Sequence, residues 1–262
     1  MKSAIVVAIG LMVSVSAASG AQTSTKTFAA TDLREIQIAT EVGSIEVQRH
    51  DAPEVVVTLV VKDVKKCTIT MQAQNDVLIL RAESAGGSLF KSSACEASFS
   101  VRAPVALALV SKTGAGTIAV SDREGPVTLT TGSGDIRLND VAGALMLKTG
   151  GGAITGNTPS KQITAEIGSG DMSLTGLRGS VDARTGSGNV ALIWAQAPQN
   201  AVVKVSTGSG NAMLTFPADA KLTTSFSSGS GRMRSDFGEA QGGGVQVSVK
   251  TGSGDLTIKR SG

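Results

Sequence analysis

The chain has 262 residues, of which 32 are glycine, six phenylalanine, one tryptophan and none tyrosine, and its formal net charge is +3. The charged residues are dispersed along the sequence, which argues against a nucleic-acid partner, because such a partner requires a clustered basic face. Short runs of Val, Ile, Leu and Thr between glycine turns are typical of an all-β protein and not of one built from long helices.

The first residues predict a secretory signal peptide. Lys2 precedes an apolar run over residues 4–15, and small residues follow, as in the charged, apolar and cleavage regions of such peptides. The run is too short to span a bilayer stably. We expect residues 1–21 to be removed, by cleavage after Ala21 or alternatively after Ala18. The mature chain would then be exported to the periplasm or cell surface, without a transmembrane segment and, lacking a nearby cysteine, without a lipid anchor.

Residues 22–110 are expected to form an irregular N-terminal β cap. Alternating apolar residues predict strands, which fall at residues 36–39, 44–47, 54–62, 67–71, 77–81 and 98–102. Gly43 and Ser44 look like a degenerate first copy of the turn that recurs later in the chain.

Cys67 and Cys95 are predicted to form a structural disulfide in this cap. An oxidising compartment allows them to pair, and the bond would contribute roughly 3–4 kcal/mol to stability. The alternatives are a reactive thiol or half of a metal site. These are disfavoured because His50 is the only histidine and no Cys-x-x-Cys spacing occurs.

Residues 111–262 carry an internal repeat. Its copies read TGAGTIAV, TGSGDIRL, TGGGAITG, IGSGDMSL, TGSGNVAL, TGSGNAML, SGSGRMRS and TGSGDLTI. The second glycine of each Gly-x-Gly falls at Gly116, Gly134, Gly152, Gly170, Gly188, Gly210, Gly231 and Gly254. The first four intervals are each 18 residues and the last three are 22, 21 and 23. A fixed period of this length indicates a repeat architecture.

Each repeat predicts two short strands and two turns. Apolar residues alternate with polar ones after every Gly-x-Gly, and glycine supplies the positive φ or close backbone approach that a tight turn needs. One unit cannot bury its apolar face, so copies must stack, about 4.8 Å apart, into Thr and Ser ladders around an aliphatic core. The fold class is therefore a parallel β-solenoid (β-helix), with the right-handed form favoured and the left-handed form as alternative. The charged residues 259–260, after the last strand, would discourage end-to-end pairing.

The sequence resembles a bacterial family of β-strand-repeat proteins known as candidate adhesins, with a domain of unknown function. The matching stretches read REIQIATEVGSIEVQRHDAPEVVV, NDVLIL, FSVRAPVALALVSKTGAGTIAV and the TGSGDI copies. They cover nearly the whole mature chain. The resemblance implies an exported β-helical fold and, by family label only, adhesion. It supplies no catalytic residues.

One candidate enzyme motif combines Ser88 and Lys91 with the Lys-Thr-Gly that begins at Lys112, as in serine β-lactamases. That chemistry needs the serine at the start of a helix and a Ser-Asp-Asn element, and neither is present. Lys-Thr-Gly also recurs at Lys148 and Lys250. The motif is therefore interpreted as a product of the repeat.

A calcium site is the second candidate, because Gly-Ser-Gly-Asp is similar to the calcium-binding β-roll repeat. The column after the second glycine reads Thr117, Asp135, Ala153, Asp171, Asn189, Asn211, Arg232 and Asp255. Calcium requires six to eight oxygen ligands, whereas Asp135 and Asp171 lie two layers, about 9.6 Å, apart. We expect these residues to favour the turn, with no metal and no cofactor.

The remaining candidate is a ligand rim formed by aromatic residues in the longer repeats, namely Trp194, Phe216, Phe226 and Phe237. The alternative, favoured here, is that these rings fill the core of widened layers. Glycosidases need two opposed carboxylates, and no such pair stands out, so no catalytic residue is assigned.

The sequence thus predicts an exported, non-catalytic, adhesin-like module that binds a protein, a glycan or a second copy of itself. The alternative is a β-helix carbohydrate-active enzyme, a polysaccharide lyase or hydrolase.

Overall fold

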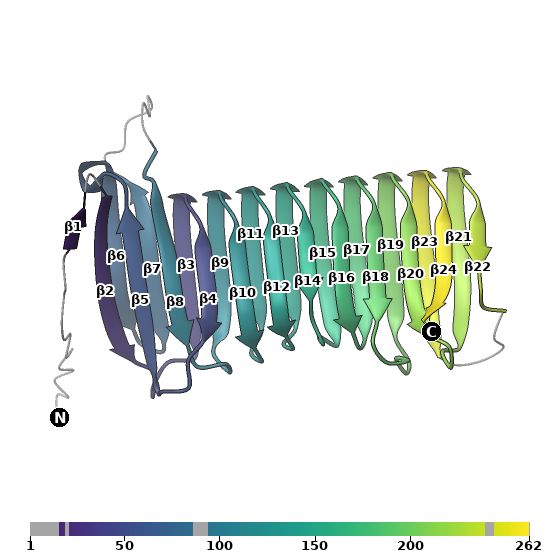
Figure 1. Cartoon of the computed structure of the whole chain (residues 1–262), viewed down its shortest axis with the longest axis horizontal. Helices are drawn as coiled ribbons and strands as arrows, with labels where there is room; N and C mark the ends of the chain where they lie inside the picture. The colour runs from purple at the N-terminus through teal and green to yellow at the C-terminus, as the bar shows by residue number, and fades with distance from the viewer. Residues whose placement is uncertain (1–15, 19–20, 86–93, 239–243, 262) are drawn as a thin grey trace, which may run out of the picture.

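The computed structural model describes residues 16–18, 21–85, 94–238 and 244–261, and these form an elongated two-sheet β-solenoid (Figure 1). Most of the predicted signal peptide lies outside the described residues. A 3-10 turn, η1 (Val64–Lys66), is the helical element of the described chain. Among the same residues, the helical content is too short and too polar to form a membrane span.

Two sheets run along the whole solenoid. The first sheet has, in spatial order, β1 (Ser16–Ala18), β2 (Ala21–Ala29), β5 (Glu54–Val61), β8 (Ala97–Ala103), β4 (Ile45–Arg49), β10 (Ile118–Arg123), β12 (Ile136–Val141), β14 (Ile154–Asn157), β16 (Met172–Leu177), β18 (Val190–Trp194), β20 (Ala212–Pro217), β24 (Leu256–Ser261) and β22 (Met233–Ser235). The second has β21 (Leu222–Ser230), β23 (Val245–Ser253), β19 (Val202–Ser209), β17 (Ser180–Ser187), β15 (Gln162–Ser169), β13 (Leu145–Gly151), β11 (Val127–Ser133), β9 (Ala108–Ala115), β3 (Glu35–Val42), β7 (Val77–Ser84) and β6 (Cys67–Gln74).

The repeats stack in register, as their constant period predicts. Ile118 of β10 pairs with Ile136 of β12, and Val127 of β11 pairs with Leu145 of β13, all in parallel. A layer therefore consists of one strand from each sheet, joined by a Gly-x-Gly turn. The all-β parallel solenoid is confirmed. Its handedness and the domain boundary at residues 110–111 stay predictions.

Glycine is required at the second position of the turn. Gly134 has φ +147°, and a Cβ there would lie 2.2 Å from the carbonyl oxygen of Gly116 in the layer before. An L side chain rarely adopts this backbone conformation and would also overlap the neighbouring backbone. The tight stacking of the turns thus depends on a glycine in every inner layer.

Buried threonines connect the layers on the inner side of each turn. Thr149 is 2% exposed, and its hydroxyl donates a hydrogen bond of 2.9 Å to the carbonyl oxygen of Gly134. The same bond to the preceding layer's second glycine is made by Thr113, Thr131, Thr185, Thr207 and Thr251. These bonds satisfy hydroxyls that would otherwise cost free energy to bury. The predicted Thr ladder is confirmed.

The spatial order of the layers departs from the chain order at the C-terminal end of the solenoid. The amide of Gly210 donates to Ser253, and that of Gly254 to Ser230, so β23 and β24 lie between the β19–β20 layer and the β21–β22 layer (Figure 1). The expectation that residues 259–260 guard an open end is therefore wrong. Strand β24 pairs on both sides, and the end layer is β21–β22.

A similar reordering occurs at the N-terminal end. Strands β3 and β4 lie between the β7–β8 and β9–β10 layers, so residues 35–49 stack directly on the first regular repeat. Gly43 has φ +141°, which confirms the predicted degenerate turn. The six predicted strands of this region form β3 to β8. Strand β2 was not predicted.

Candidate interaction surface

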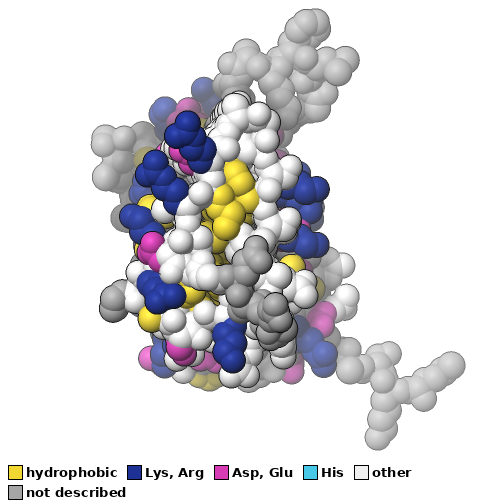
Figure 2. All heavy atoms as spheres, turned by 90° about the vertical axis from the view of Figure 1, so that its right-hand side faces the viewer, with side chains coloured by type: hydrophobic (Ala, Val, Ile, Leu, Met, Phe, Trp, Pro, Cys, Tyr) yellow, Lys and Arg dark blue, Asp and Glu magenta, His cyan; other side chains and the backbone are white. Residues whose placement is uncertain are grey.

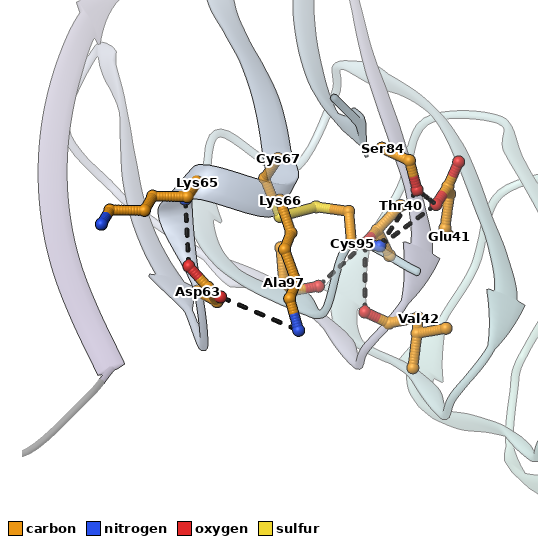
Figure 3. The surroundings of a disulfide bond; sticks show 10 residues. All are labelled: Thr40, Glu41, Val42, Asp63, Lys65, Lys66, Cys67, Ser84, Cys95 and Ala97. Atoms are coloured by element: carbon orange, nitrogen blue, oxygen red, sulfur yellow. Dashed lines mark hydrogen bonds and ion pairs between the residues drawn. A yellow bond between two sulfur atoms is a disulfide. The ribbon is translucent and has the colours of Figure 1, made fainter. Parts of the chain in front are cut away.

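The disulfide joins the two sheets near the N-terminal end (Figure 3). Cys67, at the start of β6, is bonded to Cys95, which precedes β8, and their Cα atoms are 5.0 Å apart. The Cys95 amide lies 3.2 Å from Oε2 of Glu41 and 3.2 Å from Oγ of Ser84, which bind each other. Both cysteines are buried, as the predicted structural role requires.

Removing this disulfide should destabilise the protein. The double substitution Cys67→Ser, Cys95→Ser is expected to lower the free energy of unfolding by about 3 kcal/mol, because the unfolded chain regains the freedom of the closed loop. Urea unfolding of both proteins measures the difference. Reductant should shift the wild-type midpoint and leave the double variant unchanged. Equal midpoints for the two oxidised proteins would contradict the prediction.

The Asp and Asn residues that follow the turns form a ladder of their own. Oδ1 of Asp135 accepts the Ala153 amide at 3.0 Å, and Oδ1 of Asp171 accepts the Asn189 amide at 2.7 Å. The ladder continues in spatial order from Asn189 to Asn211, Asp255 and Arg232. The hydrogen bond from the Ala153 amide holds the pKa of Asp135 below its usual value. These side chains therefore bond the next layer, in agreement with the turn interpretation.

Charged side chains on the outer face of the second sheet form ion pairs, both between neighbouring layers and within one strand. Lys148 Nζ lies 3.1 Å from Glu166 Oε2, and Arg184 Nη2 lies 2.9 Å from Asp182 Oδ2. Glu166 also lies 4.0 Å from Arg184. Exposed pairs of this kind stabilise a protein by less than about 1 kcal/mol each. They make this part of the face a solvated surface on which Glu166 and Asp182 are already paired.

The four predicted rim aromatics divide into two groups. Trp194 and Phe216 are 1% and 0% exposed, with ring centroids 4.2 Å apart in a stack. Phe237 contacts Phe216 edge-on at 6.5 Å and lies beneath the Arg260 guanidinium. Phe226 is half-buried in β21. Two of the rings thus fill the core at the longer layers, and the ligand rim stays a proposal for the two accessible rings, Phe226 and Phe237.

The longer repeats also form a surface hollow, which we call the loop groove. Its volume is about 400 Å³, and it is lined by Ala197, Pro198, Gln199, Asn200, Asp219, Ala220, Lys221 and Gly244. None of the four rim aromatics lines it. The groove was not predicted from the sequence, although the lengthened interval between Gly188 and Gly210, which contains Pro198, indicated the extra residues.

The structure describes only part of the candidate β-lactamase motif. Ser88 and Lys91 lie outside the described residues. In the Lys-Thr-Gly segment, Thr113 is buried and donates to the Gly43 carbonyl at 3.0 Å, so this segment belongs to the layer structure. No group of three or more His, Cys, Asp or Glu side chains that could hold a metal occurs within the described ranges.

Known proteins resemble the chain to different degrees. No curated protein matches the chain. Solved structures that resemble it include a candidate lipid binding protein from Parabacteroides distasonis (10% identity, TM-score 0.45, 92% of this chain and 97% of that one). Another is a candidate adhesin from Bacteroides fragilis (12% identity, TM-score 0.42, 91% and 97%). The model of the Toastrack DUF4097 family matches residues 33–259. Because this match spans most of the sequence and every inner layer of the solenoid, the chain belongs to the Toastrack DUF4097 family.

Proposed function

We propose that this protein is an exported, non-catalytic, adhesin-like module that binds a protein or glycan at the cell envelope. The observation that carries the proposal is that carboxylate side chains of the protein take part in structural hydrogen bonds and ion pairs. Asp135 and Asp171 bond the amides of the next layer, and Glu166 and Asp182 pair with basic side chains on the sheet. A glycosidase instead needs a general acid with a raised pKa beside a second carboxylate.

Two features support export. The amino-terminal residues have the pattern of a signal peptide. Cys67 and Cys95 form a disulfide, and structural disulfides persist in oxidising compartments. A rigid, elongated surface built from regular layers also suits a module that holds a partner at a distance.

The alternative function, a carbohydrate-active enzyme, is favoured by the loop groove alone, because Asp219 lines a hollow of about 400 Å³. Incubating the purified mature protein with a panel of envelope polysaccharides, and measuring the release of reducing ends and unsaturated products, separates the two functions. We expect that the protein binds some polysaccharides or proteins and that the incubation releases neither reducing ends nor unsaturated products.

The matched variant for this experiment is Asp219→Asn, which keeps the shape of the side chain and removes its charge. Under the proposed function this variant produces no product, like the wild type. Product release by the wild type that the variant loses, with an unchanged unfolding midpoint, would contradict the proposal and establish the enzyme.

A further inference from the structure

The β21 edge closes the second sheet at the C-terminal end of the solenoid. No strand among the described residues lies on its outer side. Its nine residues, Leu222–Ser230, contain neither a charge nor a proline. Natural proteins usually blunt an exposed edge with charges, proline or short length, because an open edge pairs with other chains. This edge is long and unprotected.

At the opposite end of the solenoid, the first sheet carries a protective device. On β2, the residues paired with the buried side chains of β5 are Gln22, Ser24, Lys26 and Phe28, of which the first three are polar. Alternation along the strand directs these polar side chains toward the core side of the sheet. An inward-pointing charge is one of the devices that prevent strand pairing. In the second sheet, the edge strand at that end, β6, also lacks charge and proline, so the side chains around the β21 edge decide which partner it suits.

The main-chain groups of the β21 edge are directed outward at alternate residues. The Lys221 carbonyl accepts the Val245 amide at 2.9 Å, so it points toward β23. In a parallel ladder, every second residue bonds the same neighbour. The amides and carbonyls of Thr224, Phe226 and Ser228 accordingly face away from β23, ready to pair with an added strand.

The side chains of this layer offer a small apolar centre. In the register with β23, Thr224 and Phe226 occupy the columns of the buried Val247 and Val249. Phe226 is only half-buried, and Met233 of β22 is 42% exposed. Figure 2, which views this end of the solenoid, shows an apolar patch in the middle of the face and Lys and Arg side chains around it.

The charge around this face is positive. Among the described residues, Lys221, Arg232 and Arg234 lie in or next to the end layer and are exposed, as are two acidic residues, Asp219 and Asp236. None of the three cations forms a salt bridge within the described part of the chain. Unpaired basic groups beside an open strand edge complement an acidic partner, because opposite charges favour encounter and orientation.

A second copy of the chain fits this face less well. The edge is about 30 Å long and the two sheets with their side chains about 20 Å deep, so a symmetric pair would bury roughly 1,200 Å² in total. That value is at the lower limit for a stable interface. Such a pair would also bring two sets of Lys221, Arg232 and Arg234 together. An extended peptide needs only the edge and its pockets.

We propose that the β21 edge binds an extended, acidic segment of a partner protein by strand addition. The added strand pairs with the amides and carbonyls of Thr224, Phe226 and Ser228, places an apolar side chain on Phe226, and directs its acidic flanks to the basic side chains. This inference rests on the proposed function, of which it specifies the partner.

The first test separates main-chain pairing from side-chain contact. The probe is a fluorescent, blocked peptide of alternating Val and Thr with Asp-Glu pairs at both ends. Thr224→Pro removes one outward amide and no bond to β23. Thr224→Ala loses the same side chain and keeps the amide. We expect wild type and Thr224→Ala to bind the peptide alike and Thr224→Pro to bind roughly tenfold more weakly. Equal binding by all three proteins would overturn the proposal.

The second test addresses charge and does not depend on the proline variant folding. Reversing Lys221, Arg232 and Arg234 to Glu should weaken peptide binding at least tenfold. The matched control reverses three exposed, unpaired cations in the middle of the solenoid, namely Lys112, Lys161 and Arg178, and should bind the peptide as the wild type does.

Three outcomes would overturn the inference. The first is that a peptide with Lys-Arg flanks binds as tightly as the acidic one. The second is that the acidic peptide does not bind at about 1 mM. The third is that sedimentation without peptide shows a protein dimer that Thr224→Pro abolishes. The last outcome would assign the edge to a second copy. The polysaccharide experiment above tests the proposed function separately, because its readout does not involve the β21 edge.

Discussion

Replacing Gly134 by alanine is expected to lower the free energy of unfolding by about 4 kcal/mol. The new Cβ would lie 2.2 Å from the Gly116 carbonyl oxygen, at a backbone φ of +147°. Neither problem can be relieved by a side-chain rotation, because both partners are backbone. Two layers would have to move apart, which also weakens the Thr149 bond to Gly134. Urea unfolding followed by circular dichroism measures the change.

Gly151 provides the matched control for this substitution. It lies in the next turn, one residue before the equivalent of Gly134, and a Cβ there would meet nothing within 4 Å. The equivalent residues in neighbouring layers, Ser133 and Ser169, already carry side chains. Gly151→Ala should therefore change stability by less than about 1 kcal/mol, in the stabilising direction. Similar losses for both variants would show that general glycine content, rather than the turn geometry, limits stability.

Replacing Arg123 by methionine is expected to lower the free energy of unfolding by about 3 kcal/mol, because it removes three buried hydrogen bonds to carbonyl groups. The Ala103 and Pro104 carbonyls keep the amides of His50 and Leu107 as donors. Arg123 is 1% exposed. Its Nη1 donates to the Ala103 and Pro104 carbonyls at 3.1 and 2.6 Å, and its Nη2 to Leu107 at 2.7 Å. Burial lowers the pKa of Arg123 to about 10, so the group stays charged at neutral pH. Its hydrogen bonds hold the connection between β8 and β9 against the first regular repeat.

The control is Arg137→Met, in the next layer. Arg137 is exposed and pairs with Asp135 at 3.0 Å, so its loss should change stability by less than about 1 kcal/mol. Differential scanning calorimetry of the two variants gives the comparison. If Arg123→Met unfolds at the wild-type temperature, the guanidinium is not what holds this connection, and water or a shifted backbone satisfies the three carbonyls.

Sequence periodicity predicted the layers well and their order poorly. The constant interval from Gly116 to Gly188 defined the register, because identical columns must stack. Because the repeats are alike, the sequence does not reveal which layers are neighbours. The core residues of β23 fit against β19 as well as the core residues of β21 would. Nothing local distinguishes a strand that follows in the chain from one that returns 44 residues later, as Asp255 does to Asn211.

The features that sequence analysis missed share a physical cause. Strand β2 has Gln22, Ser24 and Lys26 where an alternating pattern needs apolar residues, because it covers an end rather than a core. Arg123 occupies the column of Val141, yet an arginine in a sequence indicates a surface position. The polar residues of β2 and the buried Arg123 are explained only by neighbours that are distant in the chain. The β21 edge was missed for the same reason, because its exposure depends on where β23 inserts.

The insertion of β23 and β24 gives the protein a defined order of assembly. From β9–β10 to β20, growth can proceed layer by layer, as each coil finds an earlier coil beside it as a template. The next coil synthesised, β21–β22, has no such template, because its neighbour is made of residues 245–261, which emerge later. Until those residues arrive, the β19 edge and the apolar side of β21 are both unpaired and prone to wrong pairing. When β23 and β24 insert, they join the β19–β20 and β21–β22 coils to their own coil in one step. The finished end therefore unfolds only as a unit. A chain cut before residue 245 lacks an interior layer.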